Sequence, residues 1–390
     1  MKTLKDSCLA VICGQAVGDA LGGATEGWSP QAIEERHGGR VTGIVGPFLP
    51  DWATARPLAP YHKGDGHVTD DTLMTHALIE VYAKRRSHLD AYAMVDDLVP
   101  IMMGEPRWVP ELETSVPLLQ RVFLAEKWMV SQLWYAHADP REAGKGNIVN
   151  CGAAMYMAPV GLVNPGDPGA AYREAIDMAG AHQSSFGREA AGVFAAAVAA
   201  SVGPGATLET VLEAVFSLAK DGTRSAIDAV LTAVSTMARP TDDDSERELA
   251  RVVRSAVAPF DTVGSEDYRS PCLDARRPSR TKSIEELPVA LGLLMAHRGD
   301  YRSGVLAAVN YGRDSDSIAG MLGAVAAGLG GPTAVPPEWL DQIETASQVD
   351  IRGAGRLMGE VAVEIATDDL RRTEVTGERL AKILSATDER

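Results

Sequence analysis

The sequence predicts a compact, α-rich protein, and three observations support this prediction. With 390 residues, of which 45% are hydrophobic, the chain can bury a substantial core. Aromatic residues make up only 5%, whereas Gly and Ala are plentiful, which indicates helices that approach closely with small side chains at their crossings. Apolar residues recur at helical spacing along most of the chain, and alternating strand patterns are scarce.

Helix start and stop signals occur in order along the chain. The first clear helix begins at Ser29 and Pro30 and ends before Gly38. Another begins at Thr207, after which apolar residues repeat every three or four positions. Helical periodicity also appears at 73–82, 88–103, 112–136, 170–180, 186–201, 223–238, 246–258, 284–297 and 300–310.

Two stretches are predicted to be loops, at 39–68 and at 261–282. The first is too long for a simple connection and runs into the sequence TDDT at 69–72, so we expect it to be an active-site loop. Neither an internal repeat nor a linker-like tract divides the chain. A single domain over residues 1–390 is therefore expected.

Charge and cysteine usage narrow the range of partners. The formal net charge is −16, which argues against a nucleic-acid or anionic-membrane surface and favours small molecules or discrete protein sites. Cys8, Cys13, Cys151 and Cys272 lack the spacing of a zinc site or a disulfide framework. We expect a protein of the reducing cytoplasm. The oligomeric state is left open.

Three acidic clusters are the candidate functional residues. They are GDALGGATE at 18–26, TDDT at 69–72 and GRDSDS at 312–317. Taken alone, each acidic helix start is explained as a cap that complements the helix dipole. The histidines near the second cluster, His62 and His67, are interpreted as hydrogen-bonded structural groups.

The third cluster is not fully explained by capping. Asp314 and Asp316 precede a helix so apolar and Gly-rich that it must be buried, and buried carboxylates are costly unless they are paired or bind a cation. If this helix start meets Asp70 and Asp71, the repulsion among four carboxylates favours two divalent ions. The oxygen donors of Asp, Thr and Ser suit Mg²⁺ or Mn²⁺.

The order of these motifs over residues 8–331 resembles the ADP-ribosylglycohydrolase family, which includes the dinitrogenase-reductase-activating glycohydrolases and crystallin J1-like proteins. The resemblance implies an all-α orthogonal multi-helix bundle with a metal-containing cleft. It implies a binuclear Mg²⁺ or Mn²⁺ centre and release of ADP-ribose from a protein or small-molecule substrate. The positions that match the family's metal ligands are Thr69, Asp70, Asp71, Asp314, Asp316 and Ser317.

The resemblance also suggests catalytic and substrate-binding positions. The catalytic candidates are Glu26, Asp314 and Asp316, any of which could accept the proton of an attacking water. In this hypothesis the cations hold the ribose hydroxyls while the bond at C1 weakens. The candidates for substrate binding, with Asp19 as a supporting residue, are Asp19, Gly152, Tyr156, His182 and Arg313.

Two departures from the family pattern bear on the substrate. Arg313 stands where the family usually has Gly, and Tyr156 stands where an arginine is common. Residues 104–146 form a possible lid or insertion, in which Trp128 and Trp134 could stack on a base or simply pack into the core.

Three functions are therefore kept open. The first is hydrolysis of an ADP-ribosyl linkage, the second is hydrolysis of a small riboside or nucleoside, and the third is a non-catalytic crystallin-like binding protein. The intact set of oxygen donors disfavours the third.

Overall fold

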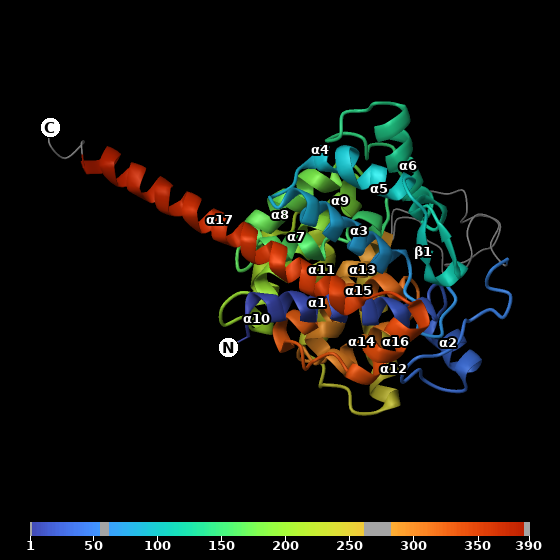
Figure 1. Ribbon diagram of the computed structural model, residues 1–390. Helices are drawn as coiled ribbons and strands as arrows, with labels where there is room; N and C mark the ends of the chain where they lie inside the picture. The colour runs from blue at the N-terminus through green and yellow to red at the C-terminus, as the bar shows by residue number, and fades with distance from the viewer. Residues whose placement is uncertain (1, 55–61, 261–281, 386–390) are drawn as a thin grey trace.

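The computed structural model describes residues 2–54, 62–260 and 282–385, and it confirms the all-α class (Figure 1). Within these residues the only sheet is a two-stranded antiparallel hairpin, in which Trp108 is opposite Ser115. Its strands are β1 (Arg107–Val109) and β2 (Thr114–Val116).

Helices occur throughout the described part of the chain. In the first half of the chain they are α1 (Leu4–Gly23), α2 (Pro30–His37), α3 (Asp70–Arg85), α4 (Ala91–Ala93), α5 (Val99–Met103), α6 (Leu124–Val130), α7 (Ala158–Val163) and α8 (Pro168–Ala179). In the second half they are α9 (Ser185–Ser201), α10 (Leu208–Leu218), α11 (Asp221–Ser235), α12 (Asp243–Val257), α13 (Lys282–Ala296), α14 (Tyr301–Tyr311), α15 (Ser315–Gly330), α16 (Pro337–Ser347) and α17 (Ile351–Ser385). Short 3₁₀ or π segments lie at 94–98, 110–112, 118–120, 131–135, 151–153 and 258–260.

Helices α1 and α15 form the central pair of the bundle, and both are almost completely buried. Glycines on α1 make their contact possible. A Cβ atom at Gly18 would lie 2.1 Å from the carbonyl oxygen of Ala319, and one at Gly22 would lie 2.3 Å from that of Ser315. Glycines spaced four residues apart therefore let the two backbones touch, as the small-residue composition predicts. This contact sets the start of α15 beside the end of α1.

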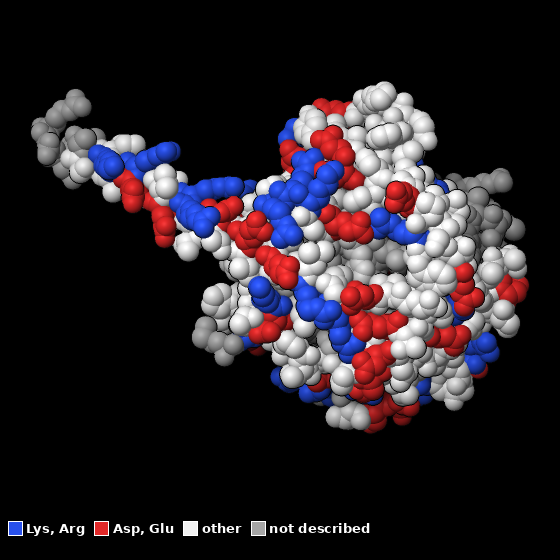
Figure 2. Space-filling model, viewed as in Figure 1, with Lys and Arg blue, Asp and Glu red and all other residues white. Residues whose placement is uncertain are grey.

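The C-terminal helix α17 has two different halves. Its first half packs on α1, α3 and α7 and buries apolar residues up to Ile365. Its second half projects away from the body of the molecule (Figure 1), and its apolar residues, such as Leu370 and Leu380, are exposed. Basic and acidic side chains alternate along this projection and are mixed over the rest of the viewed face (Figure 2).

One stretch of predicted helix is wrong. Residues 112–136 have helical periodicity, but the structure places strand β2 and a 3₁₀ turn there, and α6 begins only at Leu124. Glu113 adopts a left-handed conformation with φ of 48°, and Pro117 lacks the amide hydrogen that a helix interior requires. These two residues explain why the chain turns into a hairpin instead.

The loop predictions can be followed only in part. Residues 38–54 and 62–69 contain neither helix nor strand, as expected. Residues 55–61 and 261–281 lie outside the described part of the chain, so nearly all of the second predicted loop lies there as well. Among the described residues, we find no helix with the length and apolar character that crossing a membrane requires.

Candidate functional site

The starts of α3 and α15 meet beside the end of α1, which brings the three acidic clusters together. Carboxylate oxygens of Asp19, Asp71 and Asp316 all lie within 4.8 Å of one another. The three residues are buried. They come from positions separated by up to 297 residues in the chain, so this convergence is a property of the fold.

Asp19 organises the start of α3. Its carboxylate accepts hydrogen bonds from the backbone amide of Thr69 at 3.0 Å and from that of Thr72 at 3.2 Å. The hydroxyl groups of both threonines also donate to it. Thr69 is the N-cap of α3, and its hydroxyl oxygen accepts from the amide of Asp71 at 3.3 Å. With four donors around it, the carboxylate of Asp19 fixes the start of α3 and so positions Asp70 and Asp71.

A buried network of His62, Glu111 and Arg121 supports one side of the site. The Nε2 atom of His62 lies 2.9 Å from Asp316 and 3.5 Å from Glu26, while its Nδ1 atom lies 3.1 Å from Glu111. Arg121 is fully buried and pairs with Glu111 and, at 3.2 Å, with Asp70. The prediction that His62 is hydrogen bonded is correct, but its partners are residues of the candidate site.

The charges of this network shift its titration. Burial opposes the protonated form of His62, but Glu111 and Asp316 outweigh it and hold the pKa of His62 well above its usual value. Burial would likewise raise the pKa of Glu111, yet the charges of Arg121 and His62 lower that pKa to about 2. This side of the site therefore holds fixed charges that compensate one another.

Asp70 and Asp71 are in the opposite situation. Burial raises the pKa of Asp70 to about 7, even though Arg121 opposes the shift. Burial, followed by the negative charge of Asp316, raises the pKa of Asp71 well above its usual value. Carboxylates this close cannot all be ionised unless positive charge enters the site.

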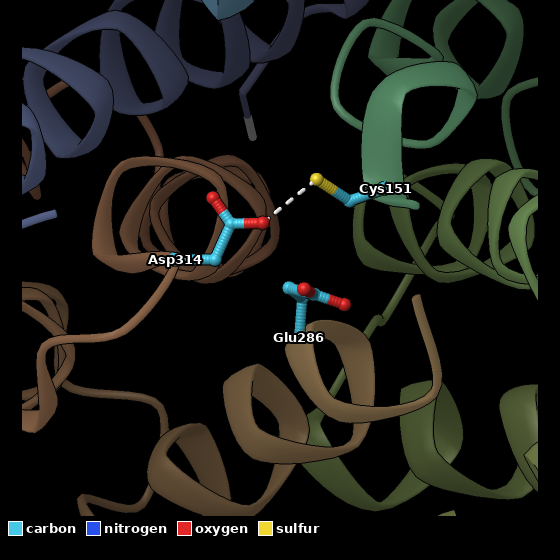
Figure 3. Close-up of side chains that lie close together, drawn as sticks. All are labelled: Cys151, Glu286 and Asp314. Atoms are coloured by element: carbon cyan, nitrogen blue, oxygen red, sulfur yellow. Dashed lines mark hydrogen bonds between the residues drawn. The ribbon is translucent and has the colours of Figure 1, made fainter. Parts of the chain in front are cut away.

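A second group lies on the other side of Asp314, where the side chains of Cys151, Glu286 and Asp314 point toward one another (Figure 3). The thiol of Cys151 donates to Asp314 Oδ2 at 3.0 Å and lies 3.3 Å from the hydroxyl of Ser317. Glu286 comes from α13 and is fully buried. Neither of its carboxylate oxygens has a hydrogen-bond partner among the described residues.

Three of the predicted substrate-binding residues, Gly152, Tyr156 and His182, lie close together in the interior. Tyr156 and His182 are fully buried, with the tyrosine hydroxyl 3.0 Å from Nδ1 of His182. The Nε2 atom of His182 lies 3.3 Å from Glu126, a residue of α6. A Cβ atom at Gly152 would lie 2.5 Å from a carboxylate oxygen of that glutamate, so a larger residue at this position would displace the glutamate side chain.

Arg313 is held by its own ion pair. It adopts a left-handed conformation with φ of 59°, and its guanidinium lies 2.5 Å from Glu285. Glu285 also accepts a hydrogen bond from the hydroxyl of Tyr311 at 2.8 Å. The preceding Gly312 packs so tightly that a Cβ atom there would lie 2.0 Å from the carbonyl oxygen of Trp28. Arg313 therefore extends toward α13.

Five buried residues at the site were not singled out from the sequence as site residues. Glu111, Arg121 and Glu126 lie in the segment 104–146, Glu286 lies in a helix that reads as ordinary core, and Cys151 lacks any metal-binding spacing. The sequence did carry one signal: charged residues inside otherwise apolar stretches, such as Glu285 and Glu286 between Ile284 and Leu287.

The donors present fit divalent cations. Asp19, Asp71 and Asp316 form one candidate group, and Cys151, Glu286 and Asp314 form the other. Hard carboxylate oxygens dominate both groups. The two buried oxygens of Glu286 receive no hydrogen bond from the described residues, and a bound cation would interact favourably with them.

The fold and the site together define a general class: all-α proteins with a buried group of carboxylates at the point where two helices begin. The particular family follows from comparison with known proteins. The chain belongs to the ADP-ribosylglycohydrolase family, because the sequence model of that family matches residues 1–372. This confirms the resemblance found in the motifs and identifies the protein as a hydrolase. The acidic groups described above can bind cations.

The similarity to known proteins extends over most of the chain. The chain is 24% identical over 347 residues to the ADP-ribosylarginine hydrolase Tri1 of Pseudomonas putida, covering 87% of this chain and 74% of that protein. It is 23% identical over 354 residues to the uncharacterized protein YegU of Escherichia coli, covering 90% and 95%. A solved structure of an ADP-ribosylglycohydrolase-related protein complex superposes with a TM-score of 0.61, at 19% identity, over 93% of this chain and 100% of that one. The last comparison supports the fold alone.

Proposed function

We propose that this protein hydrolyses the bond at ribosyl C1 of an ADP-ribosylated substrate and releases ADP-ribose, with two divalent cations, Mg²⁺ or Mn²⁺, bound at the meeting point of α3 and α15. The observation that carries the proposal is the convergence of Asp19, Asp71 and Asp316. Family membership supports the reaction class. An arginine linkage is the first candidate, because a relative is named as an ADP-ribosylarginine hydrolase.

The ligand residues in this proposal are Thr69, Asp70, Asp71, Asp314, Asp316 and Ser317. When bound, the cations would supply positive charge that orients ribose hydroxyls and lowers the pKa of a bound water. Asp19 holds the start of α3, and His62 holds Asp316 from the other side. These contacts fix the oxygen donors before any substrate enters.

Glu26 is the proposed acceptor of the water proton. Its side chain is 12% exposed, whereas that of Asp316 is 5% exposed, so Glu26 is the more accessible of the two to a water molecule. His62 lies 3.5 Å from Glu26 and connects it to Asp316. The expected phenotype of Glu26→Gln is loss of turnover with cation binding retained.

The remaining expectations accompany this proposal. Residues 1–390 form one domain, and the segment 104–146 covers the site, to which it contributes Glu111, Arg121 and Glu126. We place the protein in the cytoplasm, without a nucleic-acid or membrane partner.

The proposal is tested with Asp316→Ala. We expect this variant to lose hydrolysis and one bound cation while its circular dichroism spectrum and melting curve stay close to those of the wild type. Asp244→Ala removes a carboxylate whose side chain is 95% exposed and pairs with Arg247, and it should behave as the wild type. Full activity of Asp316→Ala would refute the assignment.

The substrate is tested separately. Purified, cation-loaded protein is incubated with an ADP-ribosylated arginine peptide, ADP-ribosylated peptides of other linkages and free nucleosides, and products are detected by mass. Release of ADP-ribose from the arginine peptide supports the proposal. Hydrolysis of nucleosides alone would replace it with the riboside function, and no hydrolysis at all would favour a binding protein.

A further inference from the structure

Glu286 is the most unusual charged group outside the motifs. It is fully buried in α13, and neither oxygen accepts a hydrogen bond from any described residue. Leaving a buried polar group unsatisfied costs about 1–3 kcal/mol, and more for a charged one. Such a group calls for an explanation in terms of what it binds.

Its neighbours supply the explanation. Ligand atoms of Cys151, Glu286 and Asp314 lie within 4.8 Å of one another, and the three side chains converge on one point from three different segments (Figure 3). Cys151 already contacts Asp314 at 3.0 Å and Ser317 at 3.3 Å. No basic residue pairs with Glu286 among the described contacts, in contrast to Glu111 and its partner Arg121.

We propose that Cys151, Glu286 and Asp314 form one of the two cation positions of the site, and that this position binds a borderline transition-metal ion such as Fe²⁺, Co²⁺ or Zn²⁺ in preference to Mg²⁺. The ligand chemistry gives the reason. A thiolate is a soft donor that Mg²⁺ does not select, whereas ions later in the first transition row bind sulfur together with carboxylates. The inference rests on the proposed function because the two positions share the segment Asp314–Ser317.

Binding at this position is coupled to proton release. A thiol that coordinates a cation loses its proton, which passes to solvent as the sulfur–metal bond forms. The cation charge then offsets the carboxylates of Glu286 and Asp314.

Cobalt provides the direct test. The metal-free full-length protein is titrated with Co²⁺, and we expect a sulfur-to-cobalt charge-transfer absorption in the near ultraviolet. Cys151→Ala should abolish this absorption. Cys8→Ala, which removes a buried thiol of α1 that is not part of either acidic group, should retain it.

A second variant guards against misfolding of Cys151→Ala. Glu286→Gln keeps the side-chain shape and the thiol, and we expect it to weaken Co²⁺ binding about tenfold or more, in line with the loss of one ligand charge. Binding of Co²⁺ without the charge-transfer absorption, no Co²⁺ binding at all, or unchanged affinity in Glu286→Gln would each overturn the inference.

The outcome is distinguishable from failure of the proposed function. If the absorption is missing while Asp316→Ala still loses hydrolysis, only the thiolate position is wrong. If the absorption is present while Asp316→Ala hydrolyses the substrate as the wild type does, the cation position stands and the proposed catalytic assignment fails.

Discussion

The two sides of the site treat buried carboxylates differently. On the side of His62 and Arg121, Glu111 is surrounded by positive charge, and its pKa falls to about 2. On the side of Cys151, no described residue donates a hydrogen bond to Glu286, and burial together with the charge of Asp314 raises its pKa well above its usual value. Both side chains are equally buried. The difference teaches that burial alone does not mark a cation site. A buried carboxylate that is paired with a basic side chain has a structural role, whereas a buried carboxylate that lacks a basic partner is available to bind a cation.

The largest effect is expected from breaking the compensated side. Arg121→Met leaves Glu111 and Asp70 without their buried partner, and we expect a loss of about 3–5 kcal/mol in the free energy of unfolding. Urea denaturation of the metal-free protein measures it. Arg251 pairs with Glu248 on the surface, and Arg251→Met should cost no more than about 1 kcal/mol. Equal losses in the two variants would contradict the comparison.

The next effect concerns Asp19, whose carboxylate satisfies the start of α3. Asp19→Asn replaces one acceptor oxygen by an amide group that donates and that faces the donors of Thr69 and Thr72. We expect this variant to lose about 1–3 kcal/mol in the free energy of unfolding. Asp242 caps the exposed start of α12, where asparagine is as good a cap. If Asp242→Asn destabilises as much as Asp19→Asn does, Asp19 is an ordinary cap.

Two further carboxylates, those of Glu174 and Asp369, are paired with a histidine, so this pairing depends on pH. His88 lies 2.6 Å from Glu174 and 2.8 Å from Asp369, which links α8 to α17. These hydrogen bonds, despite partial burial, raise the pKa of His88 to about 9 from 6.5. The stabilisation is complete below pH 6.5 and is lost as the pH rises through about 9.

After allowing for solvent screening, we expect the free energy of unfolding to fall by about 1–2 kcal/mol over that range. His88→Gln should remove this pH dependence, as measured by urea denaturation at pH 6 and pH 10. A wild-type protein whose stability changes no more than that of His88→Gln would show that the contact contributes nothing.

The smallest effect is expected at Glu286 itself. Burial raises the pKa of Glu286 and so disfavours its charged form, which glutamine lacks altogether, so Glu286→Gln should change the stability of the metal-free protein by less than about 1 kcal/mol. The same substitution should lower the melting-temperature increase that Co²⁺ produces. A strongly destabilised metal-free variant would mean that Glu286 has a structural partner.

Much of the fold could be predicted because it depends on local signals. The start of α3 at Asp70 and that of α15 at Ser315 follow from capping patterns. The close packing of α1 through its glycines follows from the high Gly and Ala content. The hairpin at 107–116 could not be predicted, because its apolar spacing also fits a helix and two turn residues override it.

The site divides in the same way. Residues in recurring motifs, such as Asp71 and Asp316, were found from the sequence. Residues that reach the site only through tertiary packing, such as Arg121 and Glu286, carry no local signal beyond being charged within an apolar stretch. The long projection of α17 was likewise not foreseen, because its apolar residues are not buried by the rest of the chain.

The count of bound cations tests the central claim most directly. Metal-free protein is dialysed to equilibrium against Mn²⁺ and the bound metal per chain is measured for the wild type and for Asp71→Asn. The account predicts two cations in the wild type and fewer than two in the variant, with the fold of both unchanged. A wild type that binds no cation, or a variant that binds as many as the wild type, would contradict it.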